Sequence, residues 1–250
     1  MQPVLLCLHG WGGSKESFDE LRAVLDGEDV KILTPDLPGF GSEPEPPRPW
    51  NMDDYADWVE DWVQKTLRPL PTEALAKAGT PYALSPLLLL GHSHGGRIAI
   101  KLANRKLPIA HLYLCAAAGT RHRSLKRVIG KALARIGGSI FALPGLKRLK
   151  SSARTLLYKL LREHDYERAS PVMRQTLAKV TAEDLTPLLS TITIPTDLFW
   201  GEDDTYTPIQ DGQTMHEAIR GSVLHTFEST RHRVHRDRAL EIASVIRNHL

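Results

Sequence analysis

The sequence of 250 residues has little of several features that mark particular classes of protein. Two cysteines exclude the dense disulfide framework of a small secreted domain. No uninterrupted apolar run approaches the roughly 20 residues that a transmembrane helix needs. The chain also runs from Met1 straight into an apolar segment, which leaves no room for a signal peptide. We therefore expect a cytoplasmic protein.

The two cysteines, Cys7 and Cys115, both lie inside apolar runs. If these runs are parallel strands with another strand between them, they lie about twice 4.8 Å apart, beyond the reach of a disulfide. No group of Cys and His residues has the spacing of a zinc site. The sequence therefore predicts reduced, buried cysteines and no metal.

What the chain does contain is the composition of an ordinary globular protein, with 42% hydrophobic and 24% charged residues. Apolar runs alternate with segments of helical pattern, which predicts an α/β fold with a mostly parallel sheet and helices on both faces. Right-handed crossovers then bring the carboxyl ends of all strands to one edge, where ligands bind. Expected strands are 3–8, 30–34, 87–90, 110–115, 192–200 and 222–227, and expected helices are 17–25, 52–67, 95–105, 208–219 and 239–249.

Residues 120–189 break this alternation. The segment is helical in composition and too long for a simple connection, so we expect a helical cap inserted into a core of residues 1–119 and 190–250. Residues 121–162 contain twelve Lys or Arg and no Asp or Glu. One reading is a cap helix whose basic face lies in water. The other is a lid that attracts an anionic substrate or makes peripheral contact with an anionic membrane. No binding motif accompanies the charge, so we expect no nucleic acid partner.

One short stretch organises the site. Gly91-His92-Ser93-His94-Gly95 fits the pattern G-x-S-x-G between an apolar run and a helix, a sharp turn that holds a serine hydroxyl clear of the backbone. A Cβ at Gly91 or Gly95 would collide with the neighbouring strand or helix. Ser93 is therefore the candidate nucleophile.

A serine nucleophile needs an adjacent base, usually a histidine that a carboxylate holds in one tautomer. In this kind of sheet the order along the chain is Ser, then Asp or Glu, then His. The expected strand 192–200 runs into Asp203 and Asp204, and the last strand runs into His232 and His235. Both pairs fall where the order requires them.

Together these motifs resemble the α/β-hydrolase superfamily over essentially the whole chain. Residues 9–13 (HGWGG) are similar to its oxyanion loop, 36–42 (DLPGFGS) to its D-x-x-G-x-G-x-S segment with the serine one position earlier, and 200–208 (WGEDDTYTP) to its W-G-x-x-D-x-x-x-P acid turn. The resemblance implies a capped fold like that of serine esterases and lipases. Family members usually carry one or two strands before the oxyanion loop's strand. Only eight residues precede His9, so we expect short or absent amino-terminal edge strands.

The resemblance also implies roles for particular residues. Aligning the acid turn places the carboxylate at Asp204, with Asp203 as the alternative. The family's G-H-x-x-H motif appears as 231–235 (RHRVH), which places the base at His232. The arginine that replaces the usual glycine leaves His235 as a minor alternative.

Two backbone N–H groups, those of Trp11 and His94, are implied as the oxyanion hole. Residues 93–97 (SHGGR) are similar to the S-x-G-G-R of the menaquinone-pathway synthase that eliminates pyruvate, in which the arginine helps to bind an anionic substrate. Arg97 is thus a candidate substrate-binding residue. The alternative is that it has a structural or surface role on its helix.

The reading that best fits these features is a carboxylesterase-type serine hydrolase that forms an acyl-enzyme with a small-molecule ester and needs no cofactor. A serine at position 93 excludes relatives that use an aspartate there, such as haloalkane dehalogenases. Two alternatives remain open. One is a C–C hydrolase or a menaquinone-synthase-like lyase that acts on an anionic substrate, and the other is a hydrolase-like protein that binds a ligand without turnover.

Overall fold

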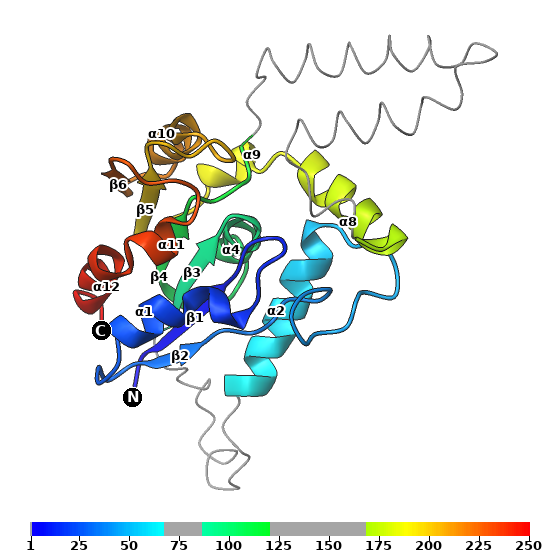
Figure 1. Ribbon diagram of the computed structural model, residues 1–250, viewed down its shortest axis with the longest axis horizontal. Helices are drawn as coiled ribbons and strands as arrows, with labels where there is room; N and C mark the ends of the chain where they lie inside the picture. Colours follow the sequence, from blue (N-terminus) through cyan, green and yellow to red (C-terminus); the bar gives the residue numbers. More distant parts are fainter. Residues whose placement is uncertain (1, 68–86, 121–168) are drawn as a thin grey trace, which may run out of the picture.

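The structure is a computed structural model that describes residues 2–67, 87–120 and 169–250. In these ranges six parallel strands form one sheet in the order β2-β1-β3-β4-β5-β6 (Figure 1). Neighbours in this order that are distant along the chain require crossover connections, as expected from the alternation of strands and helices. The strands are β1 (Val4–Leu8), β2 (Lys31–Leu33), β3 (Leu87–His92), β4 (Ile109–Cys115), β5 (Thr196–Gly201) and β6 (Val223–Phe227).

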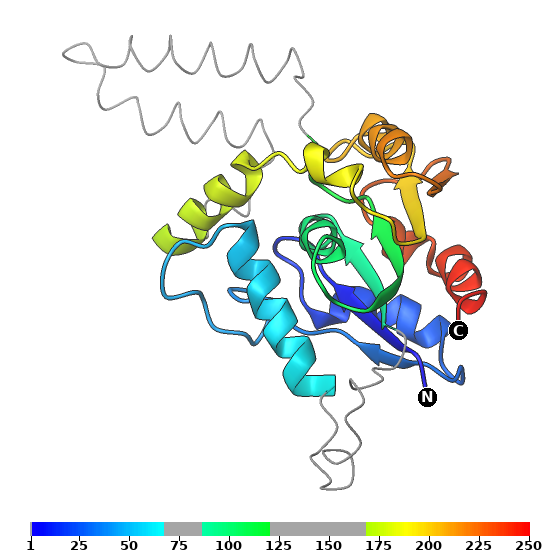
Figure 2. The ribbon, with the colours of Figure 1, turned by 180° about the vertical axis from the view of Figure 1, so that it is seen from behind.

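Helices cover both faces of the sheet (Figures 1 and 2). On one face α1 (Asp19–Val24) packs beside α12 (Ala239–Arg247), and on the other α2 (Met52–Leu67) packs beside α4 (His94–Ala103). No helix in the described part of the chain is both long and apolar enough to cross a membrane. The remaining helical elements are η1 (Lys15–Phe18), α8 (Pro171–Ala182), α9 (Thr186–Leu189), α10 (Ile209–Ala218) and α11 (Val234–Asp237).

The central strands follow from their apolar runs. Every residue of β1 and of β3 is buried, as expected for parallel strands that are covered on both faces. Cys7 lies in β1 and Cys115 in β4, with β3 between them, and both thiols are free and buried. Burial raises the pKa of both thiols. The predicted separation of the two cysteines is confirmed.

The predicted elements are present, with shifts at their ends. The strand expected at 192–200 begins only at Thr196, because Pro195 has no N–H to donate to a neighbouring strand. Its carbonyl still accepts a hydrogen bond from the Leu112 N–H at 2.9 Å. The helix expected at 17–25 divides into the 3₁₀ turn η1 and α1. On the amino-terminal side the edge of the sheet is β2, a strand of three residues.

The cap expected at 120–189 falls largely outside the described residues, and so does its basic segment 121–162. The described remainder holds α8 and α9. Thr176 of α8 accepts a hydrogen bond from the backbone N–H of Trp50 at 3.0 Å, and Leu185 and Leu189 are buried in the main core. The division into core and cap, and the contact with a membrane, stay predictions.

Candidate active site

The turn between β3 and α4 holds Ser93 in a strained conformation. Its φ of 52° and ψ of −108° lie in a region that residues with a side chain rarely adopt. Its N–H donates to the Cys115 carbonyl at 3.2 Å, and its carbonyl accepts from the Ala118 N–H at 3.0 Å. The end of β4 therefore fixes the strained residue on both sides.

Glycines make this turn sterically allowed, as the sequence predicts. A Cβ on Gly91 would lie 2.5 Å from the carbonyl oxygen of Gly95 in α4. A Cβ on Gly95 would overlap the carbonyl oxygen of Leu8 in β1. Strand and helix can therefore pack this closely around Ser93 only with glycine at both positions.

Three loops at the carboxyl edge of the sheet bring Ser93, His232 and Asp204 together. His232 Nε2 lies 3.0 Å from Ser93 Oγ, and His232 Nδ1 lies 2.8 Å from Asp204 Oδ2. Asp203, the alternative acid, is exposed, and its N–H donates to the carbonyl of Thr230. His235, the alternative base, is buried, and its ring centre lies 3.8 Å from that of His92.

The surroundings of Asp204 keep its carboxylate ionised. Its Oδ1 accepts from the N–H groups of Tyr206 at 2.7 Å and Thr207 at 3.0 Å, and its Oδ2 accepts from the Thr207 hydroxyl at 2.8 Å. Burial alone would raise the pKa of Asp204, but the hydrogen bonds and the neighbouring His232 hold it below its ordinary value. An ionised Asp204 fixes the His232 tautomer with its proton on Nδ1, which leaves Nε2 free to accept the serine proton.

Two further histidines support the loop that carries His232. His92 Nε2 lies 2.9 Å from the His232 carbonyl oxygen, and the rings of His92 and His235 are 3.8 Å apart. Burial, with the neighbouring histidines, lowers the pKa of His92 well below its ordinary range. Burial and the charges of His232, Arg236 and Arg233 lower the pKa of His235 to about 3. Both rings are therefore neutral near pH 7, and His92 donates Nε2–H to the His232 carbonyl.

The two amides expected to form the oxyanion hole flank the serine. His94 is the first residue of α4, and Trp11 follows β1 in the glycine-rich loop. This loop lies against the turn, since a Cβ on Gly10 would come 3.2 Å from Ser93 Cβ. Among the described residues neither amide donates to a backbone acceptor. The helix dipole of α4 adds positive potential at His94. The role of the two amides as an oxyanion hole stays a prediction.

Aromatic rings surround the His94 side chain. Trp11, Phe40 and Tyr55 lie with their ring centres 5.4, 6.5 and 4.8 Å from the imidazole. Burial, with the charge of Arg97, lowers the pKa of His94 to about 3, so the ring is neutral. Aromatic rings therefore pack around the residue that follows Ser93.

Phe40 owes its place to the segment 36–42, whose role in the site the sequence left open. Asp36 accepts from the Lys15 N–H at 2.7 Å and from the Ser42 N–H and hydroxyl at 2.9 and 2.8 Å. These bonds close the segment around its acid and present Phe40 to Trp11, 4.8 Å away. The signal in the sequence was the acid and serine six residues apart. No comparable sequence pattern predicts the contacts that His92, Tyr55 and Thr207 make in the site.

Arg97 lies on α4 with its side chain buried. Its Nη2 donates to the carbonyl oxygen of Glu183, between α8 and α9, at 2.5 Å. The guanidinium therefore connects the helix after the serine to the segment that follows α8. Substrate binding by Arg97 stays a prediction.

Comparison with known proteins agrees with this architecture. The profile of the "Alpha/beta hydrolase family" matches residues 5–245. A pimeloyl-[acyl-carrier protein] methyl ester esterase of Neisseria meningitidis is 26% identical over 247 residues, covering 90% of this chain and 69% of the relative. An uncharacterised protein of Mycobacterium tuberculosis is 22% identical over 255 residues, covering 92% of this chain and 70% of the relative.

Solved structures are similar over the whole chain. An esterase from Exiguobacterium antarcticum has a TM-score of 0.68 at 23% identity, covering 100% of this chain and 91% of the other. MenH from S. aureus has a TM-score of 0.67 at 21% identity, covering 99% and 93%. At these identities the likeness concerns the fold, and it confirms the fold class expected from the sequence.

Proposed function

Because the chain belongs to the alpha/beta hydrolase family, we propose that it hydrolyses carboxylic esters with Ser93 as nucleophile, His232 as base and Asp204 as the orienting acid. One observation carries the proposal: the unbroken series from Ser93 Oγ through both nitrogens of His232 to Asp204, at 3.0 and 2.8 Å. The similarity to an esterase of Neisseria meningitidis gives independent support.

In the first half of the proposed reaction, His232 Nε2 accepts the Ser93 proton as Oγ attacks the ester carbonyl carbon. The amides of Trp11 and His94 hold the oxygen that becomes negative, each being worth about 2.7–4 kcal/mol in the transition state. Asp204 stabilises the imidazolium of His232. The imidazolium then gives its proton to the leaving alcohol, and the acyl group remains on Ser93.

The second half repeats these steps with water. His232 takes a proton from a water molecule, whose oxygen attacks the acyl carbon of the acyl-enzyme. The same amides hold the second oxyanion, and His232 returns the proton to Ser93 Oγ as the carboxylic acid leaves. One ester and one water thus give one acid and one alcohol, and no cofactor takes part.

The surroundings of the serine favour a substrate with an apolar group beside its carbonyl. Trp11 and Phe40 are only partly buried and lie next to His94. The lyase and C–C hydrolase alternatives depend on Arg97, whose guanidinium donates to the Glu183 carbonyl, and on the cations of residues 121–162, which lie outside the described residues. A protein that only binds a ligand does not need a serine, an imidazole and a carboxylate in one hydrogen-bonded arrangement, which argues against the non-catalytic alternative. No observation therefore favours an alternative over ester hydrolysis.

Hydrolysis of p-nitrophenyl esters from acetyl to palmitoyl tests the proposal. We expect turnover by the wild type, none above background by Ser93→Ala, and normal turnover by Ser190→Ala, which changes an exposed serine at the end of α9. Turnover that survives in Ser93→Ala would contradict the role of Ser93. A folded wild type that cleaves none of the esters would overturn the esterase proposal in favour of one of the alternatives.

The proposed location is the cytoplasm, with which two free, buried cysteines agree. Peripheral contact with anionic membrane through residues 121–162 is a separate proposal, supported by their charge alone. Sedimentation with anionic and with neutral vesicles tests it, and equal binding to both would remove it.

A further inference from the structure

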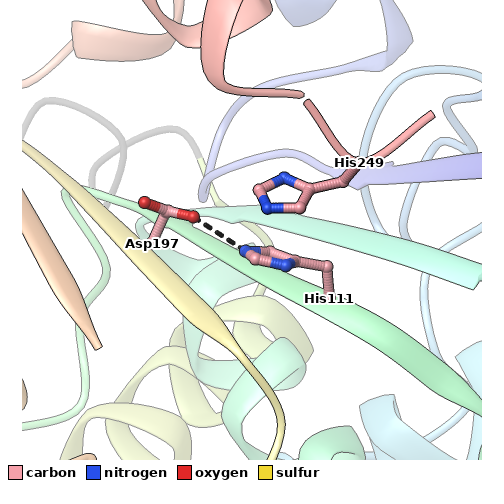
Figure 3. A group of neighbouring side chains, drawn as sticks. All are labelled: His111, Asp197 and His249. Carbon is pink, nitrogen blue, oxygen red and sulfur yellow. Dashed lines mark hydrogen bonds and ion pairs between the residues drawn. The ribbon is translucent and has the colours of Figure 1, made fainter. Parts of the chain in front are cut away.

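A second cluster of ionisable side chains lies away from Ser93, near the amino-terminal starts of the strands. His111 is near the start of β4, Asp197 is near the start of β5, and His249 follows the end of α12 (Figure 3). His111 and Asp197 are buried, whereas His249 is exposed and gives access from solvent. The proposed mechanism of ester hydrolysis uses none of these three residues.

The three side chains lie close together. One possible ligand atom from each of them lies within 4.8 Å of the other two. His111 Nε2 is 2.7 Å from Asp197 Oδ2, and the rings of His111 and His249 are stacked with their centres 3.8 Å apart. Figure 3 shows a nitrogen of each imidazole turned toward the carboxylate. These are two nitrogen donors and one oxygen donor, a set that suits zinc.

Neighbouring groups fix the orientation of these donors. Tyr113 Oη lies 2.9 Å from His249 Nδ1, which leaves Nε2 as the ligand atom of that ring. His225 Nε2 lies 2.6 Å from the other carboxylate oxygen, Asp197 Oδ1. His249 and Asp197 thus each carry a second hydrogen bond, the usual companion of a protein metal ligand, because it sets the tautomer of a ring and the direction of the lone pair.

We propose that His111, Asp197 and His249 bind a divalent transition-metal ion of the zinc type, with a water as the fourth ligand. Zn–N and Zn–O bonds of about 2.0–2.1 Å place tetrahedral ligand atoms about 3.4 Å apart. The 2.7 Å contact between His111 and Asp197 therefore opens slightly, and the exposed His249 tilts to close the shell. Bound to the metal through Nε2, His111 would carry its proton on Nδ1, and His249 would carry its proton on Nδ1, facing Tyr113 Oη.

The consequence is structural. Bound metal would join β4, β5 and the end of α12, three elements that are far apart in the sequence. Since a folded site binds the ion and an unfolded chain does not hold its ligands together, binding would stabilise the fold. No sequence pattern indicates the site, because His111 and Asp197 lie 86 positions apart along the chain and no short spacing pattern results.

Calorimetric titration of the full chain with ZnCl₂, after removal of any histidine tag, tests the proposal. We expect one bound ion to be lost in His249→Ala and retained in His216→Ala, a matched change of an exposed histidine on α10 that bonds Ser222. Tyr113→Phe should weaken binding about ten- to a hundred-fold, because His249 loses its orienting partner. A zinc ion that is lost in His232→Ala but retained in His249→Ala would be a separate ion held at the candidate active site.

Cobalt gives a direct readout of the same site. Co²⁺ bound by two imidazoles and a carboxylate should show visible absorption bands that His249→Ala abolishes and His216→Ala keeps. Circular dichroism verifies that each variant is folded. Two results would overturn the proposal. One is equal zinc binding by the wild type and a folded His249→Ala variant, and the other is an equal loss of binding in His249→Ala and His216→Ala. In both cases the binding would not depend on His249 in particular.

Discussion

The chain contains two histidine–carboxylate pairs in different parts of the sheet, and their surroundings differ. At the carboxyl edge Asp204 bonds His232 Nδ1 at 2.8 Å, and the other nitrogen faces the Ser93 hydroxyl. Near the strand starts Asp197 bonds His111 Nε2 at 2.7 Å, and a second imidazole stacks on the ring. The nitrogen that the carboxylate engages, and what faces the ring beside it, decide whether the pair is suited to move a proton or to hold a cation.

The first pair is partly open to a substrate, and the two carboxylates receive different hydrogen-bond donors. The Asp204 side chain is fully buried, while that of His232 is 19% exposed, so the imidazole can meet a substrate. Asp204 receives two backbone N–H donors and a hydroxyl, whereas Asp197 receives two imidazoles. In the first pair a fixed charge orients a single base, and in the second one charge is shared by two rings.

The largest expected effect comes from Asp204→Asn. Without the carboxylate His232 loses its favoured tautomer, and kcat/KM for a p-nitrophenyl ester should fall about ten-thousand-fold. Asp203→Asn, the matched change on the exposed neighbour, should stay within a few-fold of the wild type. Steady-state kinetics of both variants measure this difference. A reversed order would make Asp203 the acid.

A smaller loss is expected for Thr207→Val. This change removes the hydroxyl that donates to Asp204 Oδ2 at 2.8 Å, while the N–H of Thr207 still donates to Oδ1. A hydrogen bond to a charged group is worth about 1.5–3 kcal/mol, so kcat should fall about ten- to a hundred-fold. Steady-state kinetics with a p-nitrophenyl ester measure the loss. Unchanged kcat would show that the hydroxyl plays no part in orienting the acid.

Acid should destabilise the protein through its buried neutral histidines. The folded pKa of His235 is about 3, below the ordinary 6.5, so the unfolded chain binds more protons as the pH falls below 6.5. The free energy of unfolding should therefore decrease toward acid, by about 1.4 kcal/mol per pH unit for each such histidine. In His235→Gln the slope between pH 6 and pH 5, measured by urea unfolding, should flatten by about this amount. The same slope in both proteins would mean that His235 is protonated in the fold.

The smallest expected effect is that of His249→Ala on ester hydrolysis. Its ring lies beside His111 and Asp197, and the proposed reaction uses neither of them. We expect kcat/KM within about two-fold of the wild type, in the same assay that detects the loss in Asp204→Asn. A large loss of activity in a folded His249→Ala variant would show that the two clusters are coupled.

Local patterns made the candidate active site predictable. Five consecutive residues predict the turn around Ser93, and the ends of later strands predict the positions of the acid and the base. Contacts between distant elements were not predictable in this way. The His92 bond to the His232 carbonyl joins residues 140 apart, and the cluster at Asp197 depends on strand register and on where α12 ends. Even the start of β5 was set by Pro195, inside the range 192–200 that was expected to form one strand.

Trapping the acyl-enzyme tests most directly whether Ser93 is the nucleophile. The wild type is mixed with a p-nitrophenyl ester, quenched in acid within the first turnovers and digested, and the peptides are weighed by mass spectrometry. We expect one acyl group on the peptide that contains Ser93 and none in Ser93→Ala. Hydrolysis by the wild type with the acyl group on another residue, or unchanged hydrolysis by Ser93→Ala, would contradict it.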